Sequence, residues 1–289
     1  ELDLIHTTAE GLAFVAKIVV SYATGEMVDA IRAVDPVISS GYLPGTDDWE
    51  FVNYGSYLPR ARYGHCQGQN TSSYWYYFTK KQGEGARSLY CAFDSVHVSP
   101  GTLWQDNPRG YRMASVTQAH LDDERLTVKV CSQHVSSQDD WTWNALAVSM
   151  YLTHEPFTVS VYAQLPATGR WIGHSLTSYR IDLNARQIHV ADPNYPGDRD
   201  RRIEYDGRAF APYSSPSMAG VPATSFPRVM FHTKTAFIDE KCGNLRVCST
   251  AAPRKAGSSS STPRSQSAPR RATQSPPASS AARAPRPRP

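Results

Sequence analysis

Long apolar segments and metal-binding patterns are both missing from this chain of 289 residues. Its longest apolar stretch, residues 12–20, is interrupted by Lys17 and falls well short of the ~20 residues that span a bilayer. No Cys-x-x-Cys pair and no closely spaced pair of histidines occurs, so nothing predicts a zinc site. We therefore expect no transmembrane segment, no metal and no other cofactor.

Acidic residues are absent from residues 251–289, a stretch of Pro, Ser, Ala and Arg with eight basic side chains and no aromatic residue. Such a stretch cannot bury enough apolar surface to offset the entropy of an ordered chain. We expect one folded domain over residues 1–250 and a disordered basic linker or tail over residues 251–289. Because the whole chain carries a net charge of +4, residues 1–250 carry about −4.

The charge of this tail suits contact with anionic surfaces such as nucleic acid, anionic lipid or a cell-wall polymer. A solvated spacer is the simpler interpretation, and we prefer it. No feature of the chain predicts sequence-specific recognition of nucleic acid.

Cysteine is scarce, with five residues in the chain, and the number is odd. One free nucleophile and two disulfides would account for all five. Cys242 and Cys248 enclose a short loop and could pair, which leaves Cys91 and Cys131 for a second bridge, although other connectivities remain open. Paired cysteines favour an oxidising compartment, so a secreted or extracytoplasmic location is preferred over the cytosol.

Apolar periodicity along the chain predicts an α+β fold. The predicted helices cover residues 8–33, 66–81 and 140–153, the last capped by Asp139 or Asp140, and a β-branched strand covers residues 155–163. Pro36 ends the first helix, and Gly83 and Gly85 end the second. Residues 199–227 are rich in Pro, Ser and Gly and are expected to form only short strands.

Two adjacent strand patterns, residues 173–181 and 187–197, flank turn-forming residues at 182–186. A hairpin centred on Leu183 places His174 directly opposite Asp192. Directly opposed residues have Cβ atoms roughly 4.5–5.5 Å apart, so the carboxylate can accept a hydrogen bond from the imidazole. The pattern predicts an oriented histidine, which is one half of a nucleophilic site.

Cys66 is the predicted nucleophile. Small and polar residues surround it, and the following aromatic-rich run is expected to form a helix. A cysteine at a helix N-terminus lies at the positive end of the helix dipole, which favours the thiolate. The order along the chain is then a cysteine, a histidine on one strand and an aspartate on the next.

These residues resemble bacterial papain-like cysteine peptidases, and the chain is also similar to the C39-like peptidases that process bacteriocin leaders. The resemblance covers roughly residues 49–197 and rests on Trp49-Glu50-Phe51-Val52-Asn53-Tyr54-Gly55, Gly64-His65-Cys66-Gln67-Gly68, Gly173-His174 and Asp192-Pro193-Asn194-Tyr195-Pro196-Gly197. It implies a papain-like fold, in which a nucleophile helix packs on an antiparallel sheet. It also implies that Cys66 is the nucleophile, His174 the general base and acid, and Asp192 the residue that orients His174.

Two positions depart from the family pattern. Papain-like enzymes use a glutamine a few residues before the cysteine in the oxyanion hole, and this chain has none there. Asn53 is the nearest upstream amide and is the candidate oxyanion donor, with a plain turn residue as the alternative. Gln69 stands where the C39-like relatives have methionine, which bears on substrate preference.

Three other residues near these motifs are assigned supporting roles. His65 adjoins Cys66, but neighbouring helical side chains do not face each other, so it is expected to be flanking. His189 is expected to be structural, because strand parity points it away from Asp192. Trp171 precedes the histidine strand and either shields the ion pair, lines the groove or belongs to the core.

The resemblance implies a thiol hydrolase that cleaves a peptide or isopeptide bond in a peptide or protein substrate through a thioester. Two alternatives stay open. A transglutaminase-like acyltransferase would use the same triad with an amine as acceptor. A binding module would keep the papain-like fold without turnover.

Overall fold

The computed structural model describes residues 23–54, 61–93, 109–123 and 138–232, together with two short strands at 238–239 and 244–245. The first part of the predicted N-terminal helix and the basic tail lie outside the described residues. So do Cys131, Cys242 and Cys248.

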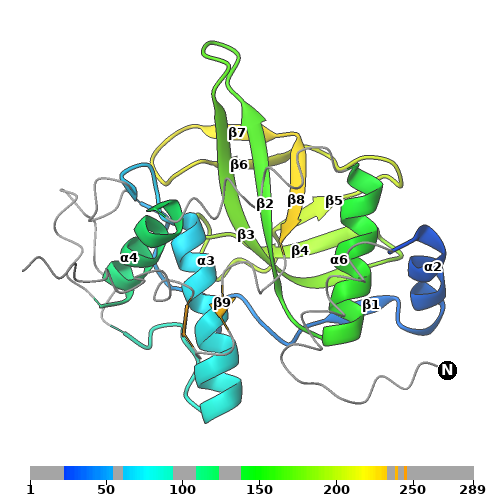
Figure 1. Cartoon of the computed structure of the whole chain (residues 1–289), viewed down its shortest axis with the longest axis horizontal. Coiled ribbons are helices and arrows are strands. Elements are labelled where there is room, and N and C mark those ends of the chain that lie inside the picture. Colours follow the sequence, from blue (N-terminus) through cyan, green and yellow to red (C-terminus); the bar gives the residue numbers. More distant parts are fainter. Residues whose placement is uncertain are drawn as a thin grey trace, which may run out of the picture. The chain divides into compact units, whose positions relative to one another are not determined.

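The described chain is a mixed α+β structure, as the periodicity predicts (Figure 1). Its helices are α2 (Gly25–Val34), α3 (Cys66–Trp75), the π-helix η2 (Tyr76–Gly83), α4 (Arg109–Asp123) and α6 (Asp139–Thr153). Its strands are β1 (Val37–Ser39), β2 (Phe157–Gln164), β3 (Trp171–Asp182), β4 (Gln187–Ala191), β5 (Arg202–Glu204), β6 (Tyr213–Pro216), β7 (Ala223–Phe226), β8 (Arg228–His232), β9 (Ile238–Asp239) and β10 (Asn244–Leu245). None of the described helices is long and apolar enough to cross a membrane.

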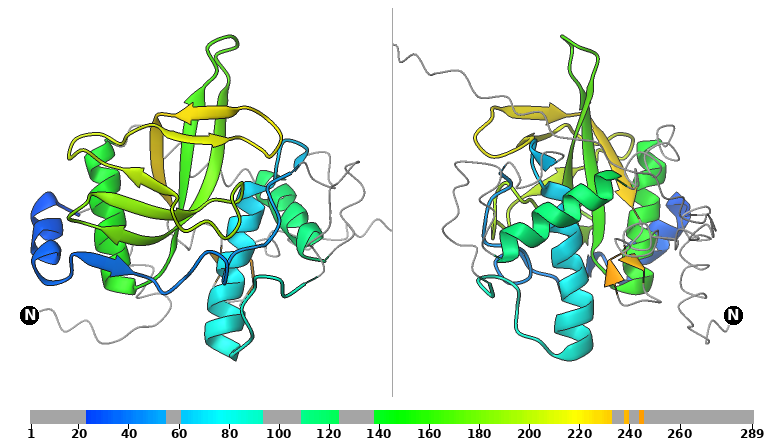
Figure 2. Two further views of the ribbon diagram at one scale, coloured as in Figure 1. Left: turned by 180° about the vertical axis from the view of Figure 1, so that it is seen from behind. Right: turned by 60° about the vertical axis from the view of Figure 1, so that its left-hand side comes forward.

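The main sheet is antiparallel and is built around β3, its longest strand. The strand order is β5-β4-β3-β2-β8, and β1 pairs with the C-terminal part of β3. The strands curl, and β6 and β7 form a separate hairpin beside them (Figure 2). Helices α3 and α4 lie on one side of the sheet, and α6 with α2 lies on the other (Figures 1 and 2).

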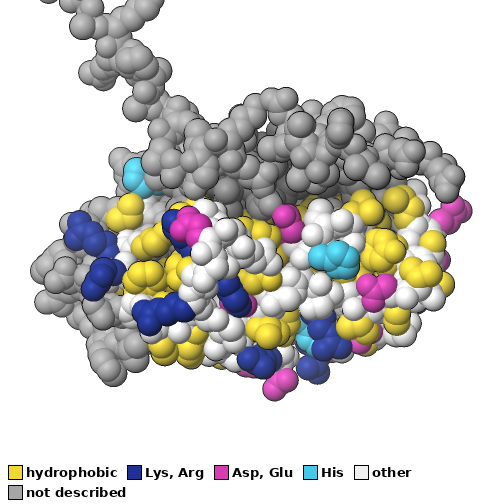
Figure 3. Space-filling model, turned by 90° about the horizontal axis from the view of Figure 1, so that it is seen from below, with side chains coloured by type: hydrophobic (Ala, Val, Ile, Leu, Met, Phe, Trp, Pro, Cys, Tyr) yellow, Lys and Arg dark blue, Asp and Glu magenta, His cyan; other side chains and the backbone are white. Residues whose placement is uncertain are grey.

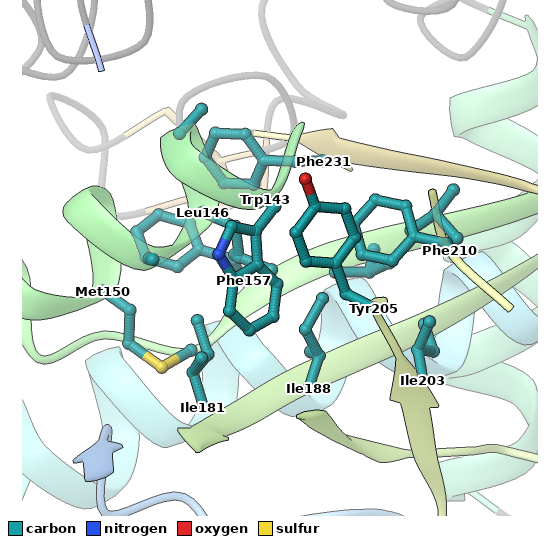
Figure 4. Close-up of a cluster of buried hydrophobic side chains, with 14 of the residues drawn as sticks. Trp143, Leu146, Met150, Phe157, Ile181, Ile188, Ile203, Tyr205, Phe210 and Phe231 are labelled. Atoms are coloured by element: carbon teal, nitrogen blue, oxygen red, sulfur yellow. The ribbon is translucent and has the colours of Figure 1, made fainter. Parts of the chain in front are cut away.

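The main hydrophobic core lies between α6 and the sheet (Figure 4). The strands alternate apolar side chains toward this core, among them Val159, Leu176 and Ile188. Helix α6 supplies Trp143 and Met150, both buried. Burial of such large side chains is worth roughly 1.5–3 kcal/mol each, so this core fixes the position of the sheet.

Helix α3 packs very closely against α4 at Gly68. A Cβ at this position would lie 2.0 Å from the Ala114 carbonyl oxygen, and the Gly68 N–H donates to Gln118 Oε1 at 3.0 Å. Only glycine leaves room for this contact. A second, aromatic cluster that includes Trp49, Phe51 and Tyr111 fills the space around these helices.

The predicted helices at 66–81 and 140–153 are confirmed, with the second half of the former wound as a π-helix. The predicted aspartate cap is wrong, because Gln138 is the N-cap of α6 and makes no side-chain cap bond. Asp139 and Asp140 lie in the first turn instead, where their charge meets the helix dipole. Helix α4 was not expected from the sequence.

Candidate active site

Cys66 is the first residue of α3, and a contact between Asn53 and the Gly64–His65 backbone fixes where that helix begins. Asn53 Oδ1 accepts the His65 N–H at 2.6 Å. Gly64 has φ +117°, and a Cβ there would lie 2.8 Å from Asn53 Oδ1. The left-handed backbone and the close approach both require glycine at position 64. Cys66 is therefore held at the helix N-terminus, half-buried, while the next eight residues are buried.

His174 and Asp192 are brought together by the sheet. The Nε2 atom of His174 lies 2.7 Å from Asp192 Oδ1, and both side chains are fully buried. Phe226 of β7 stacks near the imidazole, with ring centroids 6.4 Å apart. An aromatic neighbour of this kind keeps water from the ion pair and strengthens it.

The strand register that produces this contact differs from the predicted one. Thr177 pairs with Ala191, and a bulge between Ser178 and Arg180 shifts the remaining pairs by one residue. Continuing the register past Ala191 puts Asp192 opposite Leu176, two residues from His174. Residues two apart lie on the same face of a strand, so the shift turns a direct contact into a diagonal one that long side chains still span.

The two ring nitrogens of His174 have different surroundings. Nε2 is occupied by Asp192, whereas Nδ1 is buried and has no hydrogen-bonded nitrogen or oxygen partner in the described part of the chain. Burial lowers the pKa of His174, but the charge and hydrogen bond of Asp192 outweigh burial and raise it above its ordinary value. The Cys66 side chain adds to this rise through a hydrogen bond and through its charge. The imidazole therefore stands between the thiol and the carboxylate.

Asp192 is held by donors from three further residues. Its Oδ1 atom accepts the Asn194 N–H at 2.8 Å, and Oδ2 accepts the Tyr213 hydroxyl at 2.7 Å and the Ser215 hydroxyl at 2.9 Å. Burial raises the pKa of Asp192, but the charge of His174 and these hydrogen bonds outweigh it, so the pKa lies below its ordinary value. The carboxylate stays ionised and fixed in orientation.

Arg201 and Asn194 complete this network. Arg201 donates through Nε to the Tyr213 hydroxyl at 3.0 Å, and its Nη2 lies 3.9 Å from Asp192 Oδ2. The Asn194 amide nitrogen lies 3.0 Å from His174 Nε2 and donates to the Pro216 carbonyl at 2.7 Å. The β6–β7 hairpin is thereby tied to the His174–Asp192 pair.

The oxyanion candidate Asn53 lies beside the N-terminus of α3, but most of its amide is engaged. Besides accepting from His65, its Nδ2 donates to the Ser217 carbonyl at 3.1 Å. One amide hydrogen remains. Asn53 thus acts first as a turn-fixing residue, the alternative interpretation of the sequence.

His65 and His189 are both away from the His174–Asp192 pair. His65 is fully buried edge-on against Tyr111, with ring centroids 4.6 Å apart, and burial lowers its pKa to about 3. His189 pairs with Arg180 and Arg202 across the sheet, and burial followed by the charge of Arg180 lowers its pKa. Neither imidazole is placed to serve Cys66 as a base.

Gln69 and Trp171 take different places in the structure. Gln69 is buried, and its Nε2 donates to the Phe51 carbonyl at 2.8 Å, so it ties α3 to the preceding segment. Trp171 is 48% exposed at the start of β3, which excludes the core and places it on the surface.

Cys91 lies outside the site. It is a free, exposed thiol in a turn with φ +54°, so the pairing with Cys131, one of the connectivities considered, is not formed, and Cys131 lies outside the described residues. Cys66 is the other free cysteine among the described residues.

The sequence missed Tyr213, Ser215 and Arg201 entirely, because they come from a Pro- and Ser-rich stretch without periodicity. Asn194 carried a signal, since an asparagine two residues after an aspartate is typical of a hydrogen-bonded turn.

Within the described ranges no three His, Cys, Asp or Glu side chains converge in a way that could hold a metal ion. Comparison with protein-family models, with curated proteins and with solved structures finds no match to this chain.

Proposed function

We propose that this protein is a thiol-dependent hydrolase, a cysteine peptidase of the papain-like type, with Cys66, His174 and Asp192 as its catalytic residues. One observation carries the proposal. His174 is hydrogen-bonded through Nε2 to a buried aspartate, while its Nδ1 side is left to the only described thiol at a helix N-terminus. A base with a fixed orientation beside a thiol is the arrangement that nucleophilic catalysis needs.

The three proposed catalytic residues differ in their exposure to solvent. Cys66 is half-buried and Gly173 is exposed, whereas His174 and Asp192 are buried. A substrate carbonyl can therefore approach the sulfur, while the ion pair that activates it stays out of water. The raised pKa of His174 keeps the imidazole protonated at neutral pH. A cationic imidazole beside a cysteine favours its reactive thiolate form.

The reaction follows from these positions. The Cys66 thiolate attacks the carbonyl carbon of a peptide or isopeptide bond, and an S–C bond forms. The C–N bond then breaks as His174 transfers its Nδ1 proton to the leaving amine, which leaves a thioester on Cys66. Water attacks this thioester while His174 accepts its proton, and the C–S bond breaks to release the acid and the thiolate.

The tetrahedral intermediates have two donors within the site. The Cys66 N–H is among the first amides of α3, which have no intrahelical acceptor. The remaining amide hydrogen of Asn53 is the second donor. Because removal of one oxyanion donor costs about 10²–10³ in turnover, Asn53 also contributes to the rate in this mechanism.

Turnover of a protein substrate tests the proposal. Wild-type protein is incubated with a mixture of unfolded proteins, and newly formed amino termini are mapped by mass spectrometry. We expect cleavage by wild type and by Cys91→Ala, and none by Cys66→Ala with its fold intact. Adding glycine amide as a competing acceptor distinguishes hydrolysis from acyl transfer, because products that carry glycine amide would show transfer of the acyl group to an amine instead of to water. Cleavage that survives in Cys66→Ala would contradict the proposal.

A further inference from the structure

Two exposed aromatic side chains, close in the sequence to Cys66 and His174, contact arginines that the mechanism does not use. Tyr63 is three residues before Cys66 and is 59% exposed, and Trp171 is three residues before His174 and is 48% exposed. Arg62 and Arg170 both stack on the Tyr63 ring, with their Cζ atoms 4.6 and 5.6 Å from its centroid. We call these residues, together with Arg228, the arginine rim.

The arginine rim joins the two halves of the site. Arg170 belongs to the turn of the β2–β3 hairpin, which is closed by the Leu165 N–H bonded to the Arg170 carbonyl at 2.8 Å. Its contact with Tyr63 links that hairpin to the segment that leads into α3. Arg228 stacks on Trp171 at 5.2 Å. The Nη2 of Arg62 also donates to the Tyr63 hydroxyl at 2.5 Å. A guanidinium carries five N–H donors, so an arginine stacked on a ring can still bind a carboxylate through its remaining N–H groups.

The rim concentrates positive charge that makes no ion pair within the described part of the chain. Arg62 and Arg170 share one ring, so their Cζ atoms lie at most about 10 Å apart. No carboxylate among the described residues pairs with Arg62, Arg170 or Arg228. Like charges held this close repel each other unless an anion joins them.

The segments that carry the arginine rim contain no acidic residue that could supply this anion. The segments 51–83, 156–181 and 207–238 contain no Asp or Glu at all, although residues 1–250 carry a net negative charge. On the side of the molecule away from the hairpin turn, acidic and basic side chains are interspersed (Figure 3). The absence of acidic residues is thus a property of the three segments that carry the arginine rim.

We propose that the arginine rim binds acidic side chains of a peptide substrate on either side of the bond that Cys66 attacks. This inference rests on the proposed peptidase function, because the position of the rim beside a thiol nucleophile favours a polypeptide over other polyanions. Tyr63 and Trp171 add apolar contact for neighbouring residues of the same peptide. The substrate class is therefore acidic peptide segments.

Binding to a protein without turnover tests this inference. Two mixtures of octapeptides carry the same neutral fluorophore and differ only at two positions, fixed as Glu in one mixture and as Gln in the other. Their affinities for Cys66→Ser protein are compared by fluorescence anisotropy. We expect tighter binding of the Glu mixture, with the preference falling as salt is raised.

The variants assign that preference to the rim. Because exposed ion pairs are weak, each of Arg62→Gln, Arg170→Gln and Arg228→Gln should weaken Glu binding by about two- to fivefold. The triple variant should bind both mixtures equally, and Arg208→Gln, an exposed arginine elsewhere, should behave as the parent protein.

Equal binding of the two mixtures by the parent protein would overturn the inference. So would tighter binding of single-stranded DNA or of anionic lipid vesicles than of the Glu mixture. This test can fail independently of the proposed peptidase function. An unreactive Cys66 together with an intact preference for Glu would contradict the peptidase function and would still support an acidic-peptide binding site.

Discussion

Asp192 accepts hydrogen bonds from four groups, on His174, Asn194, Tyr213 and Ser215. A buried carboxylate without partners would take up a proton, since burial alone raises its pKa. The four donors reverse that effect and hold the charge that in turn keeps His174 protonated. At the scale of single residues, the site depends on this fixed negative charge.

Tyr213→Phe removes one of these donors and keeps the ring. Hydrogen bonds to charged groups are worth about 1.5–3 kcal/mol, so we expect a loss of stability of about that size. The alkylation rate of Cys66 at pH 6 should fall, because the charge of Asp192 is less well held. Urea unfolding and iodoacetamide labelling measure the two effects. Tyr195→Phe is the matched control, since its ring also lies under Arg201, and equal effects of both variants would refute this role of Tyr213.

Sequence reasoning reached part of the site at this scale. The pairing of His174 with Asp192 was predicted with the wrong register, and the contact forms because a shift of two residues preserves the strand face. Tyr213 and Ser215 could not be predicted, since their contacts depend on how a separate hairpin folds onto the sheet. No local pattern encodes such a long-range approach.

Helix α3 determines where the thiol lies, and its position depends on the contact with α4. Gly68 lets the two helices approach until a Cβ would overlap the Ala114 carbonyl. The sequence predicted α3 from the aromatic-rich run that follows the small and polar residues around Cys66, but α4 was missed. The close packing of the two helices therefore has a sequence signal only in α3, where Gly68 itself provides it.

Gly68→Ala should push the two helices apart. Overpacking in a core usually costs about 1–3 kcal/mol, and a contact with rigid backbone places this variant at the upper end. Gly25→Ala, where a Cβ meets nothing within 4 Å, is the control and should stabilise the protein by about 0.4–1 kcal/mol. Urea unfolding followed by circular dichroism compares the two. A Gly68→Ala protein as stable as wild type would show that α3 and α4 are not held at this distance.

The candidate active site as a whole exists only when the helical layer and the sheet are assembled. Cys66 comes from α3, His174 from β3, and Asp192 from the turn after β4, which the β6–β7 hairpin holds in place. Residue types and chain order were sufficient to predict the α+β class and the three reactive residues as candidates. The arrangement of layers was not predictable, because π-helix η2, helix α4 and the β6–β7 hairpin are stabilised by tertiary contacts.

The pH dependence of Cys66 alkylation by iodoacetamide, in wild type and in His174→Ala, tests the central claim most directly. The raised pKa of His174 means that the imidazolium persists as the pH rises beyond 6.5, so a cation lies beside Cys66 across neutral pH. An ordinary thiol is only roughly 0.3% ionised at pH 6, given a pKa of about 8.5. Cys66 in wild type should therefore react about tenfold faster or more at pH 6 than in His174→Ala, even though a stabilised thiolate is intrinsically less nucleophilic.

Cys91 in the same protein gives the internal reference, because it is exposed and has no histidine beside it in the described structure. We predict that mass mapping at pH 6 finds half-buried Cys66 labelled before exposed Cys91, and that His174→Ala reverses this order. Labelling of Cys66 that rises with pH as for an ordinary thiol, and that is unchanged in His174→Ala, would contradict the proposed thiolate–imidazolium pair.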